Sequence, residues 1–491
     1  MVAASLFGFL AVAGVERASA AAPERPNVVI IFIDDLGYAD IGPFGATAYP
    51  TPNLDRMAAE GRKFTDFHTS SAVCSASRAG LLTGCYHERV SIVGALRPNS
   101  PHGINSDELT LAEVCKQKGY ATAVYDKWHL GDRKKFLPLQ HGFDEYYGLP
   151  YSNDMWPRGH RGEVLGPDAG RRKEYPPLRM FEGNEVVDQK VTPEDQTQLT
   201  KEYTRRAVDF IDRHRDEPFF LYVPHSMMHV PLYVSKEFEG KSGAGLWGDA
   251  MMEVDWSVGQ ILEALKRNGV DEKTLVVFTS DNGPWLNFGD HGGSAGPLRE
   301  GKGTMWEGGC RVPCVMRFPG QIPAGSTCDA LSATLDLLPT VAGLLDVTLP
   351  EGRTIDGRDI WPLMTGGPEV KTPHEYFYCY YDHELRGIRD ERWKLMLPHK
   401  SRTLNGREGG RGGYPVHYDT EQVELALYDL DADVGETTNV ADEHPEVVAR
   451  LKAAAEAARA DLGDSLTGVK GKNVRPAGVR GERGRTPQAG S

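Results

Sequence analysis

One short segment places a cysteine, two serines and an arginine within five residues, Cys74-Ser75-Ala76-Ser77-Arg78. Ser75 or Ser77 is expected to cap a short helix, which would put Cys74 near the helix N-terminus. Free N–H groups and the helix dipole favour negative charge there, and Arg78 adds a cation one turn away. From these residues alone, Cys74 is either a reactive thiolate or an ordinary buried cysteine.

Two apolar runs end in similar polar turns. Residues 27–33 (NVVIIFI) lead into Asp34-Asp35-Leu36-Gly37, and residues 274–280 (TLVVFTS) lead into Asp281-Asn282-Gly283. Continuous β-branched runs predict strands buried on both faces, as in a parallel sheet. The carboxyl ends of such strands are where an open α/β sheet places its site. Taken alone, both endings are also ordinary turn sequences.

The side chains at these two strand ends offer only oxygen atoms. The candidate metal ligands are Asp34, Asp35, Asp281 and Asn282. Oxygen ligands favour the hard cations Ca²⁺ or Mg²⁺ over zinc.

A third set of candidates supplies cations and proton carriers. Lys127 and His129 are two residues apart after a predicted strand, so their side chains are expected to share one face. His229 follows another predicted strand, with His225 four residues earlier as the alternative, and Lys302 lies in a Gly-Lys-Gly-Thr run.

The cysteine segment, continued to Leu82-Thr83-Gly84, resembles the signature of the formylglycine-dependent sulfatases, with Ala76 where proline is commoner. The resemblance extends from about residue 26 to 462 and is strongest to the branch containing arylsulfatase A and N-acetylgalactosamine-6-sulfatase. The block Lys127-Trp128-His129-Leu130-Gly131 also matches, although Asp126 stands where glycine is usual. This departure leaves the local backbone geometry open.

The resemblance implies an activity and a set of roles. A separate formylglycine-generating enzyme would oxidise Cys74, and the hydrated aldehyde would attack the sulfur of a sulfate ester. The metal, Ca²⁺ or else Mg²⁺, would be bound by the four strand-end residues and by residue 74. The other site residues implied are Arg78, Lys127, His129, Ser152, His229 and Lys302. His129 would take a proton when sulfate leaves, and His229 with Lys302 would assist the leaving alcohol.

The elements that must position these residues alternate between strand and helix. Further strands are expected near residues 121–125, 219–223 and 312–318, with amphipathic helices around residues 199–211 and 254–265. This order predicts an α/β fold with helices on both faces of a large sheet. The resemblance implies an alkaline-phosphatase-like mixed sheet with a small C-terminal α+β domain that contains an antiparallel sheet.

The chain divides into four predicted parts. Residues 1–20 resemble a signal peptide, 26–367 a catalytic domain and 368–465 a smaller domain, while 466–491 is predicted to be disordered. We therefore expect a secreted or periplasmic protein without a membrane span.

Composition limits the partners. The chain has 55 basic and 69 acidic residues and a net charge of −14, which argues against a nucleic-acid-binding protein. Its seven cysteines include no CxxC pair, so a thiolate zinc site is not expected. The expected partners are a sulfated small molecule or glycan and the maturing enzyme.

Two alternatives stay open at this point. The same fold and aldehyde could serve a phosphodiester or phosphonate monoester hydrolase, because these esters carry the charge of a sulfate monoester. The chain could also be an inactive protein that binds sulfated glycans and keeps Cys74 unmodified. His102, His291, Arg299 and the segment 156–172 are candidates for shaping a leaving-group pocket.

Overall fold

The computed structural model describes residues 25–166 and 170–480. The predicted signal peptide, residues 1–20, lies outside the described residues. Among the described residues, no helix has the length and apolar character needed to cross a membrane.

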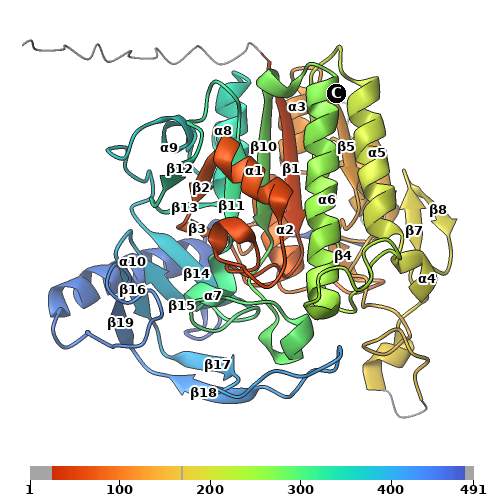
Figure 1. Ribbon diagram of the computed structural model, residues 1–491. Coiled ribbons are helices and arrows are strands. Elements are labelled where there is room, and N and C mark those ends of the chain that lie inside the picture. The colour runs from red at the N-terminus through yellow and green to blue at the C-terminus, as the bar shows by residue number, and fades with distance from the viewer. Residues whose placement is uncertain (1–24, 167–169, 481–491) are drawn as a thin grey trace, which may run out of the picture.

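A ten-stranded mixed sheet forms the centre of the molecule (Figure 1). Its five central strands run parallel, and antiparallel pairs join them to the strands on either side. In spatial order the strands are β12 (Ser326–Cys328), β2 (Arg62–Phe64), β11 (Cys314–Arg317), β10 (Thr274–Ser280), β1 (Asn27–Ile33), β9 (Phe219–Val223), β5 (Ala121–Tyr125), β6 (Glu145–Gly148), β7 (Met180–Glu182) and β8 (Glu185–Asp188). The expected fold class is confirmed.

Strand β1 is buried on both faces because its side chains alternate between two hydrophobic cores. Val28, Ile30 and Phe32 face one core, and Val29 and Ile31 face the other. Helices α1 (Pro52–Glu60), α5 (Leu199–Arg213) and α6 (Gly245–Arg267) cover one face of the sheet. Helices α2 (Cys74–Thr83), α3 (Leu111–Lys116) and α8 (Leu337–Leu344) cover the other.

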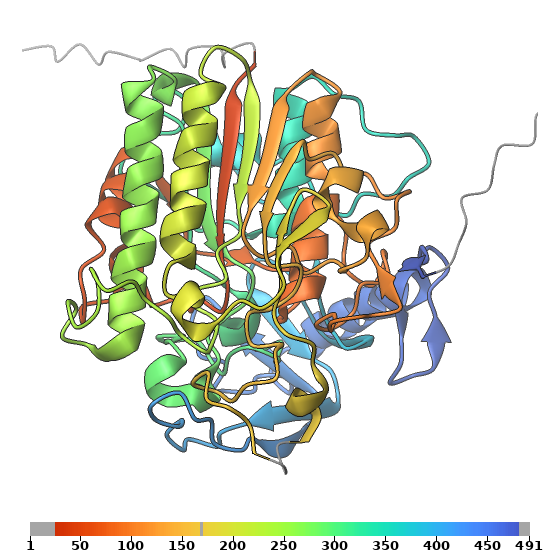
Figure 2. The same ribbon diagram turned by 90° about the vertical axis from the view of Figure 1, so that its right-hand side faces the viewer.

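A smaller C-terminal unit lies beside the end of the sheet at which β1 stops (Figures 1 and 2). Its four antiparallel strands are β14 (Phe377–Tyr381), β15 (Glu384–Arg389), β16 (Trp393–Met396) and β19 (Ala426–Asp429). Helix α10 (Pro445–Leu462) packs on them around a third core. A separate hairpin, β17 (His399–Thr403) with β18 (Asp419–Val423), extends from this unit.

Buried charges join the small unit to the large sheet. Lys394 of β16 lies 2.9 Å from carboxylate oxygens of both Glu307 and Glu436, and all three side chains are fully enclosed. Arg389 of β15 pairs with Asp66 at 2.8 Å and with Glu307 at 3.0 Å. Glu307 opens helix α7 (Glu307–Cys310), five residues after Lys302, so this network supports the segment that carries Lys302.

The predicted disorder from residue 466 is wrong as far as residue 480. β22 (Gly478–Val479) pairs with β4 (His102–Gly103), and Arg475 pairs with Glu108 at 2.8 Å. These long-range polar contacts order a segment whose own composition is poor in apolar residues. Residues 481–491 lie outside the described residues.

Candidate active site

Cys74 is the first residue of α2 and is 2% exposed. The expected serine cap is not found, because the residue before the helix is Val73 and no side chain caps it. Ser75 Oγ instead accepts a hydrogen bond from the Leu96 amide at 2.9 Å. The position of Cys74 at the helix start is nevertheless as predicted.

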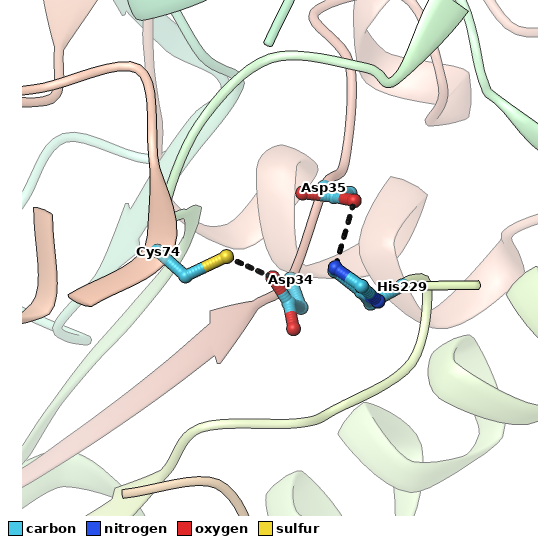
Figure 3. A group of neighbouring side chains, drawn as sticks. All are labelled: Asp34, Asp35, Cys74 and His229. Atoms are coloured by element: carbon cyan, nitrogen blue, oxygen red, sulfur yellow. Dashed lines mark hydrogen bonds and ion pairs between the residues drawn. The ribbon is translucent and has the colours of Figure 1, made fainter. Parts of the chain in front are cut away.

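The two strand ends meet as the parallel pairing of β1 and β10 requires. The Asp281 amide donates to the Ile33 carbonyl at 2.9 Å, and the Asp35 amide donates to Asp281 Oδ1 at 3.2 Å. Asn282 Nδ2 donates to Asp35 Oδ1 at 2.8 Å. The structure therefore brings the four predicted oxygen ligands together beside Cys74, whose Sγ lies 3.4 Å from Asp34 Oδ1 (Figure 3).

Arg78 fixes one of these carboxylates. Its Nε and Nη2 donate to Asp281 Oδ2 at 3.1 and 2.9 Å, and its Nη1 donates to the Lys127 carbonyl at 2.9 Å. Both charged side chains are completely buried. Burial alone would lower the pKa of Arg78, but Asp281 and Asp34 outweigh it, so the pKa is raised and the cation is permanent.

Two lysines reach the same cluster from different loops. Lys127 Nζ contacts Asp34 Oδ2 and lies 3.3 Å from Ser152 Oγ. Lys302 Nζ lies 2.6 Å from Asp35 Oδ1 and 3.5 Å from Cys74 Sγ. Burial lowers the pKa of Lys302, but the Asp35 carboxylate more than offsets it, so Lys302 keeps its proton.

The structure separates the two candidate histidines. His229 Nε2 points to Asp35 Oδ2 at 3.6 Å (Figure 3), and its Nδ1 donates to the Val230 carbonyl at 2.6 Å. His225 Nε2 instead lies 3.1 Å from Ser257 Oγ on α6. His229 is thus the histidine at the cluster. Burial and then Lys302 lower its pKa, so the ring is neutral near pH 7.

His129 has a defined proton arrangement. Its Nε2 lies 2.9 Å from the Leu96 carbonyl, which can only accept, so this nitrogen carries the proton. Its Nδ1 is buried and has no partner within the described part of the chain. Burial first, and then Lys127, holds the pKa of His129 well below its usual range. The free Nδ1 is therefore an acceptor.

Asp126, which replaces the usual glycine, adopts a φ of 108°. Its Oδ2 accepts hydrogen bonds from the amide and hydroxyl of Ser226 at 2.6 and 3.1 Å. The Ser226 carbonyl in turn accepts from the His229 amide at 3.0 Å. The backbone thus tolerates aspartate in place of the usual glycine. The hydrogen bonds of Asp126 link the Lys127 segment to the His229 loop.

Cys74 is unsuited to act as a thiolate in this setting. Burial, and then the Asp34 carboxylate, raises the pKa of its thiol well above the ordinary value. Three carboxylates and three cationic side chains surround this sulfur. The protonated thiol is neutral, so it balances none of these charges. The geometry favours a different chemical group at position 74.

The strand-end residues fit a divalent metal. Asn282 Oδ1 is buried and lacks a hydrogen-bond partner among the residues described. Burial raises the pKa of Asp281, and the neighbouring Asp34 carboxylate raises it further. A cation among these oxygen atoms would give Asn282 Oδ1 a partner and would favour the ionised form of Asp281. Carboxylate and amide oxygens suit Ca²⁺ or Mg²⁺. Asp34, Asp35, Cys74 and His229 also converge closely enough to offer ligand atoms to one ion.

Sequence reasoning missed Trp285. Lys302 Nζ lies 4.2 Å from the centroid of its ring, and the His229 ring centroid is 5.3 Å away. Its position four residues after Asp281, in the same loop beyond β10, was the available signal.

The leaving-group candidates separate in the structure. His102 lines a cavity of about 690 Å³ together with Val73, next to Cys74. His291 lines another, of about 440 Å³, with residues 160 and 161 of the suggested segment. Arg299 instead stacks on Trp306 at 3.6 Å and donates to the Glu436 carbonyl, so it supports the domain contact and lines neither cavity.

Replacing Arg78 with alanine is expected to lower the free energy of unfolding by about 3–5 kcal/mol, because it leaves Asp281 as an uncompensated buried charge. Urea denaturation monitored by circular dichroism measures this. Arg205→Ala is the matched control, since this exposed arginine of α5 pairs with Glu202 and Asp209 in solvent and should cost about 1 kcal/mol or less. Equal losses in the two variants would contradict the buried-charge account.

Comparisons with known proteins agree with this geometry. The sulfatase family model matches residues 26–347, and the C-terminal model of N-sulphoglucosamine sulphohydrolase matches residues 301–404. Arylsulfatase A of Bos taurus is 38% identical over 451 residues, covering 88% of this chain and 86% of its own. N-acetylgalactosamine-6-sulfatase of Canis lupus familiaris is 38% identical over 380 residues, covering 73% of this chain and 70% of its own.

A solved structure gives the same result at the level of the fold. The PsFucS1 sulfatase from Pseudoalteromonas sp. superposes with a TM-score of 0.80 at 27% identity, covering 89% of this chain and 90% of that one. The family model spans well over half of the chain, and the arylsulfatase A match extends over most of it. The chain therefore belongs to the sulfatase family and is a sulfuric ester hydrolase that cleaves sulfate esters.

Proposed function

We propose that this sulfatase acts through a formylglycine made from Cys74, with a sulfated sugar, or an aryl sulfate in its place, as substrate. The observation that carries the proposal is the setting of Cys74 Sγ, 3.4 Å from Asp34 Oδ1 and 3.5 Å from Lys302 Nζ. A thiol there is protonated and inert, whereas an aldehyde hydrate would offer hydroxyl groups to both neighbours. The N-acetylgalactosamine-6-sulfatase relative supports a sugar sulfate.

Asp34, Asp35, Asp281 and Asn282 would hold the metal, with residue 74 beside them. We propose Ca²⁺, with Mg²⁺ as the alternative. When bound, the metal supplies positive charge that acidifies the hydrate and neutralises sulfate oxygens.

Side chains of the protein carry out the first half of the reaction, the transfer of the sulfate group to residue 74. One hydroxyl of the hydrate attacks sulfur while its proton passes to His229 Nε2, the ring nitrogen that carries none because Nδ1 donates to the Val230 carbonyl. The bond from sulfur to the leaving alcohol then breaks. Lys127 binds a sulfate oxygen, and Lys302 binds the ester oxygen beside His229. Ser152 positions Lys127, whose Nζ lies 3.3 Å from its Oγ. His229 gives the proton that it took from the hydrate to the leaving oxygen, and its lowered pKa makes the protonated ring a stronger acid.

The second half regenerates the aldehyde. The remaining hydroxyl gives its proton to His129 Nδ1, the buried nitrogen that already lacks one. The carbonyl double bond re-forms as the bond between carbon and the sulfate oxygen breaks, so sulfate leaves with both electrons of that bond. Water then adds to the aldehyde and restores the hydrate.

Maturation and location follow from the same proposal. A formylglycine-generating enzyme would oxidise Cys74, and export to the periplasm or outside the cell would follow from the signal-like residues 1–20. Fractionation of the native host is the check, with the protein expected outside the cytoplasm.

Parallel assays test the reaction class. Matured enzyme is expected to hydrolyse nitrophenyl sulfate faster than a nitrophenyl phosphonate monoester at equal concentration. Faster turnover of the phosphonate would overturn the assignment of sulfate esters as the preferred substrates. Tight binding of sulfated glycans without any turnover by matured protein would instead favour the inactive binding protein.

His229→Ala is expected to lower kcat for sugar sulfates by about 10²- to 10⁴-fold and kcat for nitrophenyl sulfate much less. The reason is that an alkoxide needs a proton to leave, whereas a nitrophenolate does not. The measurement is kcat for both substrates. His225→Ala is the control, since its ring contacts Ser257 and should not change the ratio between substrates. An equal loss on both substrates in His229→Ala would contradict its role as the acid.

A further inference from the structure

Arg402 lies on the β17–β18 hairpin and is held against the loop that carries Lys302. Its guanidinium stacks 4.6 Å from the ring centroid of Tyr418. It also fills the space beside Gly303, where an added Cβ would lie only 2.1 Å from Arg402 Nη2 and where φ is +79°. The positive φ favours glycine next to Lys302, and the guanidinium packs against this glycine.

The hairpin itself is anchored on both sides of Arg402. Thr403 Oγ1 donates to Glu300 at 2.6 Å, and the Asn287 amide donates to Tyr418 Oη at 3.2 Å. Asn287 and Glu300 both belong to the stretch between β10 and Lys302. The position of Arg402 relative to the reacting centre is thus built into the fold.

No carboxylate of the described residues pairs with this guanidinium. Arg402 forms no ion pair with any acidic side chain in the described ranges, and its Nε is buried without a hydrogen-bond partner. Glu300 is near enough to Arg402 for an electrostatic interaction but forms no ion pair with it. Burial raises the pKa of Glu300, so this carboxyl is less able to balance the charge of Arg402. A partly buried arginine without an anionic partner is costly unless something else supplies the anion.

A cavity of about 690 Å³ lies between the two regions. Val73, the residue before Cys74, and Tyr381 both line it, together with Arg97 and Asp382. The pKa of the Tyr381 hydroxyl is raised chiefly by burial and lowered in part by Arg402. A ligand in this cavity would lie between Val73 and a tyrosine that is within range of the Arg402 charge.

We propose that Arg402 is a specificity-determining residue that binds a second anionic group of the substrate, a carboxylate or a second sulfate, while the scissile sulfate lies at residue 74. The guanidinium fork matches either group with two parallel hydrogen bonds. The substrate class is then a saccharide with at least two negative charges. This inference rests on the proposed function.

The test compares three substrates with matured wild-type enzyme and three variants. The substrates are one neutral disaccharide bearing a single sulfate, the same disaccharide with a second sulfate, and its counterpart with a uronic carboxylate. The variants are Arg402→Gln, Arg402→Lys and Arg407→Gln. Arg407 is the matched control because it removes one charge from the same hairpin but pairs with Asp419 at 2.8 Å in solvent.

Arg402→Gln is expected to lower the ratio of kcat/KM for doubly to singly charged substrates by about tenfold or more, chiefly through KM. Arg402→Lys should restore part of this ratio, and Arg407→Gln should leave it unchanged. A fall for only one of the two dianionic substrates identifies which group, carboxylate or sulfate, Arg402 binds.

Two outcomes would overturn the proposal. An equal loss on all three substrates would show that Arg402 merely supports the Lys302 loop. An unchanged ratio in Arg402→Gln, with normal turnover, would remove the second-anion site and leave the proposed mechanism standing. Failure of the matured wild-type enzyme on every sulfate would instead refute the proposed function and the inference with it.

Discussion

Cys74→Ala is expected to lower kcat toward nitrophenyl sulfate by at least about 10⁴-fold while the protein stays folded. The loss follows from removing the only group on which the proposed covalent step can occur. The side chain is small and sits among polar neighbours, so the free energy of unfolding should change by no more than about 1 kcal/mol. Initial rates and thermal denaturation on the same preparation measure the two effects.

Cys115→Ala is the matched control for this experiment. Cys115 is also fully buried, but it lies on α3 and packs in the apolar core, away from the cluster of charges. Its replacement should cost similar or greater stability and leave kcat near the wild-type value. Substantial turnover by Cys74→Ala, or a collapse of its thermal stability well beyond that of Cys115→Ala, would contradict the account.

Removal of divalent metal is expected to lower kcat by at least about a hundredfold and to lower Tm as well. Without the ion, Asp34, Asp35 and Asp281 are three buried carboxylates whose charges are compensated mainly by Arg78 and two lysines. Chelation followed by differential scanning calorimetry and rate measurement tests both effects. Ca²⁺ should restore both values, and Mg²⁺ is the comparison.

Zinc provides the discriminating control for the metal. The proposed ligands are oxygen atoms, so Zn²⁺ should restore activity less well than Ca²⁺. Unchanged rates after exhaustive chelation would refute a metal at this site. Better recovery with Zn²⁺ would instead indicate that His229 or the Cys74 sulfur binds the ion.

The central strands could be predicted from the sequence with their bounds. The runs 27–33 and 274–280 correspond to β1 and β10, because continuous β-branched residues followed by Asp and Gly leave few alternatives. Their polar endings also identified the cluster, since parallel neighbours end at one edge of the sheet.

Features that depend on distant contacts escaped prediction. Residues 466–480 are ordered through Glu108 and β4, more than 360 positions away for the Arg475 pair. His229 was the expected histidine, and the contact of His225 with Ser257 removes the alternative. Trp285 and Arg402 carry no motif, and only their placement around Lys302 gives them significance.

Mass spectrometry of the peptide that contains Cys74 tests the central claim most directly. The protein should come from its native host or from cells that also make a formylglycine-generating enzyme, and its turnover of nitrophenyl sulfate should be measured on the same sample. The account predicts an aldehyde at residue 74, in a fraction of molecules that rises in proportion to activity across preparations. A fully active sample in which residue 74 is an unmodified thiol would contradict it.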